Sequence, residues 1–290
     1  MAKRRPPSVN GFVVIDKPAG MTSHDVVAKL RKRFNEKRVG HAGTLDPDAT
    51  GVLLVGVGYV TRLMTYLSGM SKSYVGEVVL GSTTTTLDDS GETTATFDMS
   101  AVTLADVEAA ASRFVGEVEQ IPPMVSALKV DGKRLHELAR EGIEVERKAR
   151  RITIHSLAVA PTVEPHVFSI DVTCSSGTYI RTLAADLGEV LGGGAHLRRL
   201  RRTSIGPFTL ADAVGIDDAE LGSSREALRG MAHVVVDESV VALIRNGRSL
   251  PLFDGDGPWA VVDEQSRLVA VYEHGGDAAK PGVVFAEPIA

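Results

Sequence analysis

The twelve residues GHAGTLDPDATG, at positions 40–51, place two aspartates and a histidine among glycines and a proline. Gly40 and Gly43 allow the backbone to approach another group closely, because glycine has no side chain. Pro47 keeps the preceding residue, Asp46, out of the helical region of backbone conformation. We therefore expect Asp46 on a stiff loop, a presentation that suits a nucleophile or a base.

The same twelve residues allow two other interpretations. Asp, Pro and Gly are common turn formers, so the segment could be a structural turn. Asp46 and Asp48 flank a proline, and in an extended conformation both side chains would point to one side, as the carboxylate pair of a glycosidase requires. A metal site is disfavoured, because no second cluster of His, Asp or Glu lies nearby and DPDATG is too short for a calcium loop. The residues alone do not choose between the two aspartates.

The composition is that of an ordinary globular protein: 43% of the 290 residues are hydrophobic and 24% are charged. No apolar run approaches the roughly 18 to 20 residues that span a bilayer, and the start, MAKRRPP, lacks the apolar stretch of a secretory signal. We therefore expect no membrane contact and a cytoplasmic location. The single cysteine, Cys174, excludes an internal disulfide, and its alternating context VFSIDVTC predicts a buried side chain.

The net charge of −5 is spread unevenly along the chain. Residues 212–290 are strongly acidic, whereas residues 1–211 carry a small basic excess. Lysines and arginines cluster at 28–38 and again at 194–206. Clusters of this kind suit a polyanion such as RNA, because each phosphate neutralised releases condensed counterions. A solvated charged face is the alternative.

The hydrophobic pattern predicts an α+β fold, because strands alternate irregularly with helices and no βαβ repeat or Gly-rich nucleotide fingerprint is present. A capping box at Thr22 and Asp25 predicts the start of the first helix. We expect strands at 12–15, 52–58, 74–80 and 167–174, and helices at 23–34, 104–115 and 180–191. We expect three parts: a disordered basic tail at 1–10, a main domain at 11–235 with an exposed excursion at about 120–150, and a small β domain at 236–290.

Six stretches of the sequence resemble the bacterial tRNA pseudouridine synthase B family, whose members isomerise the T-loop uridine at tRNA position 55. The GH-x-G-x-LDP-x-ATG-x-L string is highly specific, and it is followed in the expected order by GTYIRT. The stretches are GFVVIDKPAGMTSHDVV (11–27), RVGHAGTLDPDATGVLLVGVGYVTR (38–62), KSYVGEVVLG (72–81), IPPMVSALKVDGKRLHELAREG (121–142), CSSGTYIRTLAADLG (174–188) and HLRRLRRTSIGPF (196–208).

The resemblance implies a pseudouridine synthase fold, with a mixed, largely antiparallel central sheet flanked by helices and a small C-terminal barrel-like domain of the PUA type. It implies that the enzyme flips the target base out of the T-loop and needs no cofactor or metal. It further implies that the partner is the T-arm of tRNA, and that the protein is a monomer without an obligate protein partner. A grip on the T-loop would also allow a role in tRNA folding.

The resemblance also assigns roles to single residues. It selects Asp46 over Asp48 as the catalytic aspartate, with Arg181 as the cation that keeps it ionised. Tyr74 matches the tyrosine that stacks on uracil and can assist proton removal at C5. His41, Tyr179 and Leu200 match other substrate-binding positions. Contacts to RNA phosphates are expected from Lys17, Lys129, Arg198, Arg199, Arg201 and Arg202.

Two features separate the chain from other members of the wider family. Relatives that work within guide-RNA particles share the LDP string but lack the PP-x-x-SA-x-K excursion at 122–129, so the stand-alone tRNA enzymes are the closer match. Family members often have tyrosine where this chain has Val125 and His136, which predicts different contacts from that excursion. A tRNA-binding protein without chemistry is a competing interpretation, and the glycosidase interpretation is disfavoured by the scarcity of aromatic residues, at 5%.

Overall fold

The computed structural model describes residues 6–126, 128–130, 133–135, 138, 141–143 and 145–289. A nine-stranded sheet forms the main domain, with β1, β3, β12, β4, β11, β10 and β7 in spatial order, β2 paired to β3, and β13 paired to β12. Its pairings are antiparallel except for β3 with β12, which is parallel. The expected mixed, largely antiparallel sheet is thus confirmed. The strands are Gly11–Lys17 (β1), Val39–Ala42 (β2), Thr50–Val57 (β3), Lys72–Leu80 (β4), Gly116–Gln120 (β7), Arg150–Pro161 (β10), Val167–Cys174 (β11), Ala195–Ile205 (β12) and Phe208–Thr209 (β13).

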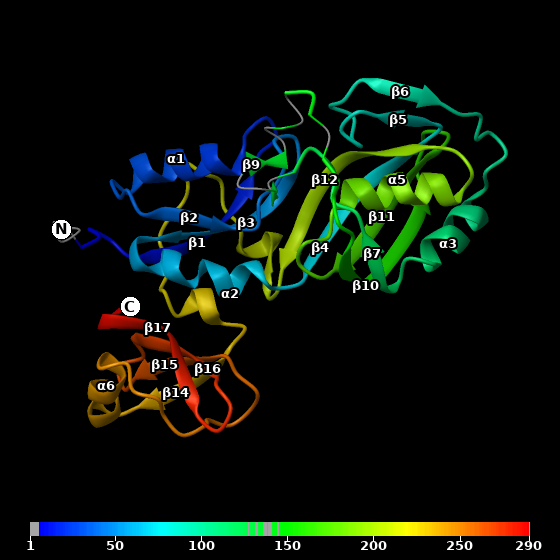
Figure 1. Cartoon of the computed structure of the whole chain (residues 1–290). Coiled ribbons are helices and arrows are strands. Elements are labelled where there is room, and N and C mark those ends of the chain that lie inside the picture. Colours follow the sequence, from blue (N-terminus) through cyan, green and yellow to red (C-terminus); the bar gives the residue numbers. More distant parts are fainter. Residues whose placement is uncertain are drawn as a thin grey trace.

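The helices cover the two ends of this sheet (Figure 1). Side chains alternate along β1 and β3, so that one set packs under α1 (Ser23–Arg33) and the other under α2 (Met64–Ser68) and the preceding 3₁₀ helix η1 (Gly58–Leu63). At the far end, α3 (Leu104–Ser112) and α5 (Ile180–Val190) pack on the β4, β10 and β11 side. The main domain therefore has its core on both faces of the sheet.

Local signals in the sequence explain where the helices begin. Thr22 and Asp25 form the predicted capping box of α1, and Thr103 with Asp106 forms another before α3. Tyr179 precedes α5 without a side-chain cap. Cys174 is fully buried in the core under α5, as predicted. Short hairpins are formed by Ser82–Thr84 (β5) with Thr93–Thr96 (β6), and by Lys129–Val130 (β8) with Lys133–Arg134 (β9).

The C-terminal part is a four-stranded sheet with the order β14, β15, β16, β17 and one helix, α6 (Glu238–Arg245). Its strands are Ala232–Val236, Trp259–Asp263, Leu268–His274 and Ala279–Ile289. Pairing among the described residues does not close the first strand on the last, so the expected barrel-like module is an open sheet. In Figure 1 these orange and red strands lie beneath α2, and one face of the sheet shares a hydrophobic cluster with η1, α2 and β3.

The two remaining 3₁₀ helices, η2 (Leu210–Asp212) and η3 (Glu226–Leu228), lie in the connection between the two sheets. Arg229 holds this connection together, because its guanidinium contacts the Asp212 carboxylate at 2.7 Å and lies over the ring of Phe208. Among the described residues, no helix is long and apolar enough to cross a membrane.

Candidate active site

Five of the six residues to which the sequence assigns catalytic or substrate-binding roles line one cavity of about 320 Å³. They come from separate segments, because the loop between β2 and β3, the strand β4, the start of α5 and the strand β12 all meet there. The five residues are Asp46, Tyr74, Tyr179, Arg181 and Leu200. Lys72, and Arg202, which the sequence assigned to a phosphate contact, also line it.

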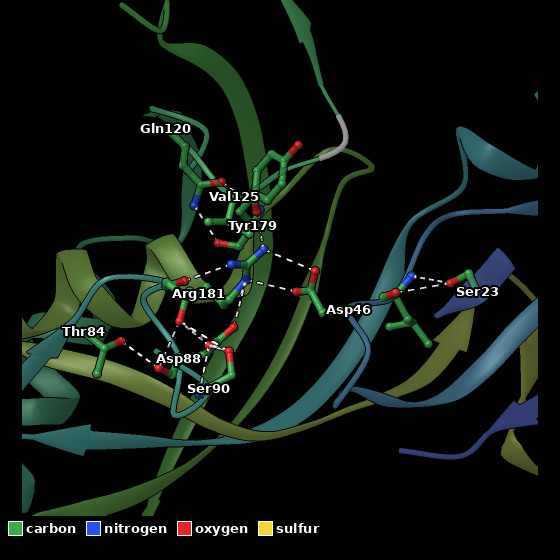
Figure 2. Close-up of polar contacts among 11 residues, drawn as sticks. Ser23, Asp46, Thr84, Asp88, Ser90, Gln120, Val125, Tyr179 and Arg181 are labelled. Atoms are coloured by element: carbon green, nitrogen blue, oxygen red, sulfur yellow. Dashed lines mark hydrogen bonds and ion pairs between the residues drawn. The ribbon is translucent and has the colours of Figure 1, made fainter. Parts of the chain in front are cut away.

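The loop that carries Asp46 is fastened on both sides of the aspartate. Before it, the hydroxyl of Ser23 accepts a hydrogen bond from the Leu45 amide at 2.9 Å and donates one to the Leu45 carbonyl at 3.2 Å (Figure 2). After it, Lys17 Nζ donates to the Pro47 carbonyl at 2.8 Å. The stiff loop expected from the proline is therefore also anchored by buried side chains of β1 and α1.

Arg181 holds the Asp46 carboxylate through two of its nitrogens. Nε lies 3.0 Å from one carboxylate oxygen and Nη2 lies 3.2 Å from the other, which is the fork geometry of strong arginine–carboxylate pairs. The arginine side chain is only 5% exposed, whereas that of Asp46 is 43% exposed toward the cavity. The carboxylate is thus fixed from behind and open in front.

The remaining donors of Arg181 bind two other segments (Figure 2). Nη1 donates to the Thr86 carbonyl at 2.8 Å, and Nη2 donates to the Val125 carbonyl at 2.8 Å. Nε also lies 3.5 Å from the carboxylate of Asp88. One guanidinium therefore joins α5, the Asp46 loop, the β5–β6 turn and the segment after β7.

Burial and the neighbouring charges have opposite effects on the pKa of Asp46. Burial raises the pKa of Asp46, and the negative charge of Asp88 raises it further, whereas the positive charge of Arg181 and its hydrogen bond lower it. Without the arginine, a carboxyl in this cavity would tend toward its neutral form. Arg181 is consequently the group that stabilises the ionised form of Asp46 in this cavity.

Asp88 was not singled out by the sequence. Its carboxylate accepts hydrogen bonds from the hydroxyls of Thr86 and Ser90, and the backbone around it is tied to Leu197 of β12. Leu87, just before it, has a left-handed backbone with φ of +63°. In sequence, TTTTLDDSG has the composition of an exposed turn, and no local signal indicates that its aspartate reaches an arginine more than ninety residues away.

Tyr74 lies opposite Arg202 in the pairing of β4 with β12. Tyr74 is 7% exposed and Arg202 is 1% exposed. The guanidinium donates to the carbonyls of Val52 at 2.7 Å and Gly43 at 2.8 Å. Burial raises the pKa of Tyr74, and the adjacent Arg202 opposes that rise as a positive charge and as a hydrogen-bond donor. Arg202 therefore forms the back wall behind the tyrosine.

Lys72 is a second buried cation beside Arg202. Its ammonium donates to the carbonyls of Ser68 at 3.0 Å and Met70 at 2.8 Å. Burial, together with repulsion from Arg202, lowers the pKa of Lys72 to about 8. The sequence gives no sign that this lysine, at the start of a strand, lines the cavity.

The Gln120 side chain fixes the backbone of Tyr179, and the strand β4 lies close to Leu200. The Tyr179 amide donates to Gln120 Oε1 at 2.8 Å, and Gln120 Nε2 donates back to the Tyr179 carbonyl at 3.1 Å. Leu200 lies in an irregular part of β12, where a side chain at Gly76 of β4 would lie 3.5 Å from Leu200 Cδ1. Tyr179, fixed at the start of α5 by Gln120, and Leu200, on β12, both line the cavity.

The excursion predicted at about 120–150 covers this cavity. Ser126 and Leu128 line it, and the described residues Gln120, Leu135 and Leu138 are buried. The segment is therefore not exposed along its whole length, because its apolar side chains pack inward. His136 lies outside the described residues.

His41 does not line the cavity. It lies on β2, where its ring meets that of His24 edge to face with ring centres 5.4 Å apart. Burial, together with His24 and Arg202, lowers the pKa of His41 to about 4. The imidazole is therefore neutral at physiological pH, and a contact to substrate would be that of an uncharged ring.

The six expected phosphate contacts fall into three groups. Lys17 is buried with its ammonium on three backbone carbonyls, and Arg202 is buried with Nε and Nη2 on two others, so the expected phosphate contact does not fit either residue. The side chain of Lys129 lies outside the described residues. Arg198, Arg199 and Arg201 are partly exposed, and each contacts a carboxylate of the same chain. Charge counted along a sequence does not reveal such pairing.

Three family models match the chain in succession. "TruB family pseudouridylate synthase (N terminal domain)" matches residues 31–180, "tRNA pseudouridylate synthase B C-terminal domain" matches 181–231, and "tRNA Pseudouridine synthase II, C terminal" matches 231–286. The tRNA pseudouridine synthase B of Arthrobacter sp. strain FB24 is 42% identical over 297 residues, covering 96% of this chain and 97% of the relative. That of Symbiobacterium thermophilum is 49% identical over 247 residues, covering 82% of each chain.

Solved structures show the same fold. A chain from the crystal structure of a Cbf5-Nop10-Gar1 complex superposes with a TM-score of 0.71 at 26% identity, covering 96% of this chain and 84% of that one. A chain from an H/ACA RNP bound to a substrate RNA containing 2'-deoxyuridine gives the same TM-score at 24% identity, covering 95% and 84%. The second likeness is one of fold alone.

Proposed function

The chain belongs to the TruB family of pseudouridylate synthases, and from this membership we propose how its residues divide the isomerisation of uridine in tRNA. The activity is that of a tRNA pseudouridine synthase acting on position 55. The observation that carries the assignment of roles is the two-point contact of Arg181 with Asp46 at the wall of a cavity that also contains Tyr74.

The reaction rearranges one nucleotide without adding or removing atoms. The N1–C1′ bond breaks, the uracil turns within the site, and a C5–C1′ bond forms. The C5 proton leaves and N1 gains one, so no electron acceptor or donor enters the balance. The protein must therefore supply an ionised group beside the sugar, a surface on which the base can turn, and a path for one proton.

Asp46 is the ionised group in this proposal. Its carboxylate faces the cavity and is held by Arg181. The backbone on either side of Asp46 is anchored by Ser23 and Lys17. A charge kept in a partly buried site is less solvated and therefore more reactive than one in water, provided that a fixed cation keeps it charged. The carboxylate of Asp88, 3.5 Å from Nε of the same arginine, helps to orient the guanidinium in this proposal.

Tyr74 provides the surface for the base in this proposal, and Leu200 and Tyr179 complete it. Stacking on an aromatic ring contributes about 1 to 3 kcal/mol per base, which offsets part of the cost of unstacking the target from the T-loop. Burial raises the pKa of Tyr74, and the positive charge of Arg202 behind it opposes that rise. In this proposal Arg202 therefore supports the phenolic oxygen as an acceptor for the C5 proton. Tyr74 thus combines stacking with a route for the proton.

We further propose that the T-arm of tRNA is the part recognised, that the protein works as a monomer, and that it works in the cytoplasm. The bacterial relatives reported above are named as tRNA pseudouridine synthase B and are matched over 97% and 82% of their length, which supports the first of these. We also propose that chemistry resides in residues 11–235, and that residues 236–290 serve mainly to support that domain. The shared hydrophobic cluster supports the last assignment.

The function is tested with an unmodified tRNA transcript, a transcript carrying cytidine at position 55, and an isolated T-arm hairpin. Pseudouridine is mapped by carbodiimide adducts that stop reverse transcription. We expect a stop at position 55 in the full transcript and in the hairpin, and none in the cytidine transcript. Modification at other uridines with none at position 55 would contradict the substrate assignment.

A further inference from the structure

A second cavity, of about 190 Å³, lies on the other side of the Asp46–Arg181 pair. Arg198 and Arg199 line it, and Leu200 lines both cavities. Nucleotides that flank a base held in the first cavity therefore have these two arginines within reach. The site is suited to the phosphates of an RNA strand by position and by charge.

The backbone presents the two arginines by a distortion of β12. Between Arg198 and Arg201 the pairing with β4 shifts by one residue, which is a β-bulge. Arg199 sits in that bulge with φ of +54°, a left-handed conformation that is unfavourable for a residue with a side chain. Its side chain is 65% exposed. Strain of this kind persists where the surrounding structure requires it, and it concentrates at functional sites.

Both arginines are already occupied by carboxylates of the chain itself. Arg198 donates to Glu77 at 2.6 Å through Nε, and to the two oxygens of Glu164 at 2.8 and 3.1 Å through Nη2 and Nη1. Arg199 contacts Glu77 at 3.0 Å. The paired contact with Glu164 has the fork geometry with which arginine also binds phosphate. Glu164 is 46% exposed in the connection between β10 and β11, so solvent screening makes this pair weaker than a buried one of the same geometry.

We propose that Glu164 is a specificity-determining residue whose carboxylate occupies, on Arg198, the place of an RNA phosphate. The inference rests on the proposed binding of tRNA at this face. A substrate whose target base enters the first cavity displaces Glu164 from the arginine, because the gain from seating the base exceeds the small loss of the ion pair. RNA that cannot seat a base has only the phosphate to offer, and the carboxylate competes with it.

The test is the salt dependence of RNA binding by the Glu164→Gln variant. In the wild type, RNA that seats no base leaves Glu164 on Arg198. For a transcript with cytidine at position 55 the variant therefore gains one phosphate contact, and the slope of log K against log salt should steepen by nearly one unit. The variant should bind this cytidine transcript more tightly than the wild type does at low salt, and it should lose about threefold of that advantage between about 50 and about 200 mM salt. For an unmodified transcript the slope should change little and the gain in affinity should be smaller, because its seated base displaces Glu164 in the wild type as well.

The matched control is Glu238→Gln, which makes the same charge change in an exposed ion pair with Arg245, at 3.3 Å, on α6. We expect its binding and salt slope to equal those of the wild type. A second control combines Glu164→Gln with Arg198→Gln and should abolish the gain. Melting temperatures of all variants verify that each is folded.

Three results would overturn the proposal. They are an unchanged slope for the cytidine transcript in Glu164→Gln, an equal gain in Glu238→Gln, which would indicate general charge, and a gain that survives removal of Arg198. Pseudouridine formation by the wild type is measured in parallel. If the wild type forms none, the proposed function fails, whereas the binding comparisons still decide the role of Glu164.

Discussion

Arg181 is the residue on which the geometry of the site converges. Its guanidinium contacts two carboxylates, that of Asp46, which faces the cavity, and that of Asp88. It also donates to the backbone carbonyls of Thr86 and Val125. Each contact limits the others, because a planar guanidinium has donors in fixed directions. The arginine therefore fixes position and charge together, and these two contributions can be separated by experiment.

We predict that Arg181→Ala moves the acid limb of the pH–rate profile to higher pH. The active form of Asp46 is ionised, and its pKa is already raised by burial. Removing the cation raises this pKa further, by about one unit or more, so activity is lost at a higher pH as the solution is acidified. The single-turnover rate at the pH optimum should also fall by about 10²- to 10³-fold.

Arg181→Lys is the control, because it keeps the charge but loses the fork. Its acid limb should stay closer to that of the wild type, while the rate falls through lost positioning. Single-turnover rates of pseudouridine formation from pH 5 to 9, about the range in which such profiles are readable, provide the measurement. An acid limb that is identical in the wild type and Arg181→Ala would show that the arginine does not control the ionisation of Asp46.

Among the elements, the contact between β3 and β12 determines whether the cavity forms. The two strands run parallel only over Arg201 and Arg202, which lie beside Thr50 and Gly51. At Gly51 a Cβ would lie 2.1 Å from the Arg202 carbonyl oxygen, so the strand approaches as closely as a glycine allows. The ATG residues of the opening motif therefore have a structural role, because they bring Arg202 beneath the Asp46 loop.

We predict that Gly51→Ala destabilises the fold by about 2 to 4 kcal/mol, because it combines a clash with backbone at a fixed position and a left-handed conformation. Gly116→Ala is the matched control: Gly116 has φ of +109°, close to the +102° of Gly51, but nothing lies within 4 Å of its Cβ position. Chemical denaturation measures both. If both variants lose the same free energy of unfolding, the backbone conformation alone, and not the close approach to β12, accounts for the requirement for glycine at position 51.

The elements also show what a sequence can and cannot predict. Asp46, Tyr74, Tyr179, Arg181 and Leu200 were found because each lies in a local motif, and the structure gathers them in one cavity. Asp88 and Lys72 were missed, since their roles arise only from contacts between distant segments.

The phosphate contacts illustrate a second limit. The sequence predicts one basic patch from the arginines at 198–202, but the bulge and the alternation of side chains along β12 separate them. Arg202 turns inward and is 1% exposed, whereas Arg199 turns outward. The fold class was predictable because periodicity is a local property, while burial of a charged side chain depends on the whole sheet.

At the scale of the whole molecule, the two sheets share one hydrophobic cluster. Val271 and Phe285 of the C-terminal sheet pack in the same cluster as Val60 and Leu67 of the main domain. Tyr66 donates to Glu273 at 2.6 Å, and Arg62 donates to the Val284 carbonyl at 2.6 Å while lying over the ring of Phe285. An interface that contains buried apolar side chains couples the stability of the parts it joins.

We predict that the two parts unfold together. The chain provides one natural probe in each, because its single tryptophan, Trp259, is buried in the C-terminal sheet and its single cysteine, Cys174, is buried in the main domain. Tryptophan fluorescence and pulsed thiol labelling should give the same urea midpoint and the same slope. A thiol that stays protected beyond the fluorescence transition would show that the C-terminal sheet unfolds independently.

The central claim is that one carboxylate, that of Asp46, performs the chemistry. It is tested most directly with a tRNA transcript carrying tritium at C5 of uracil, since forming the C5–C1′ bond releases that hydrogen to water. Asp46→Asn and Asp48→Asn are matched controls for each other, as both remove one charge from the same loop. We predict that Asp48→Asn releases tritium as the wild type does and that Asp46→Asn releases none; release by Asp46→Asn with loss in Asp48→Asn would contradict the account.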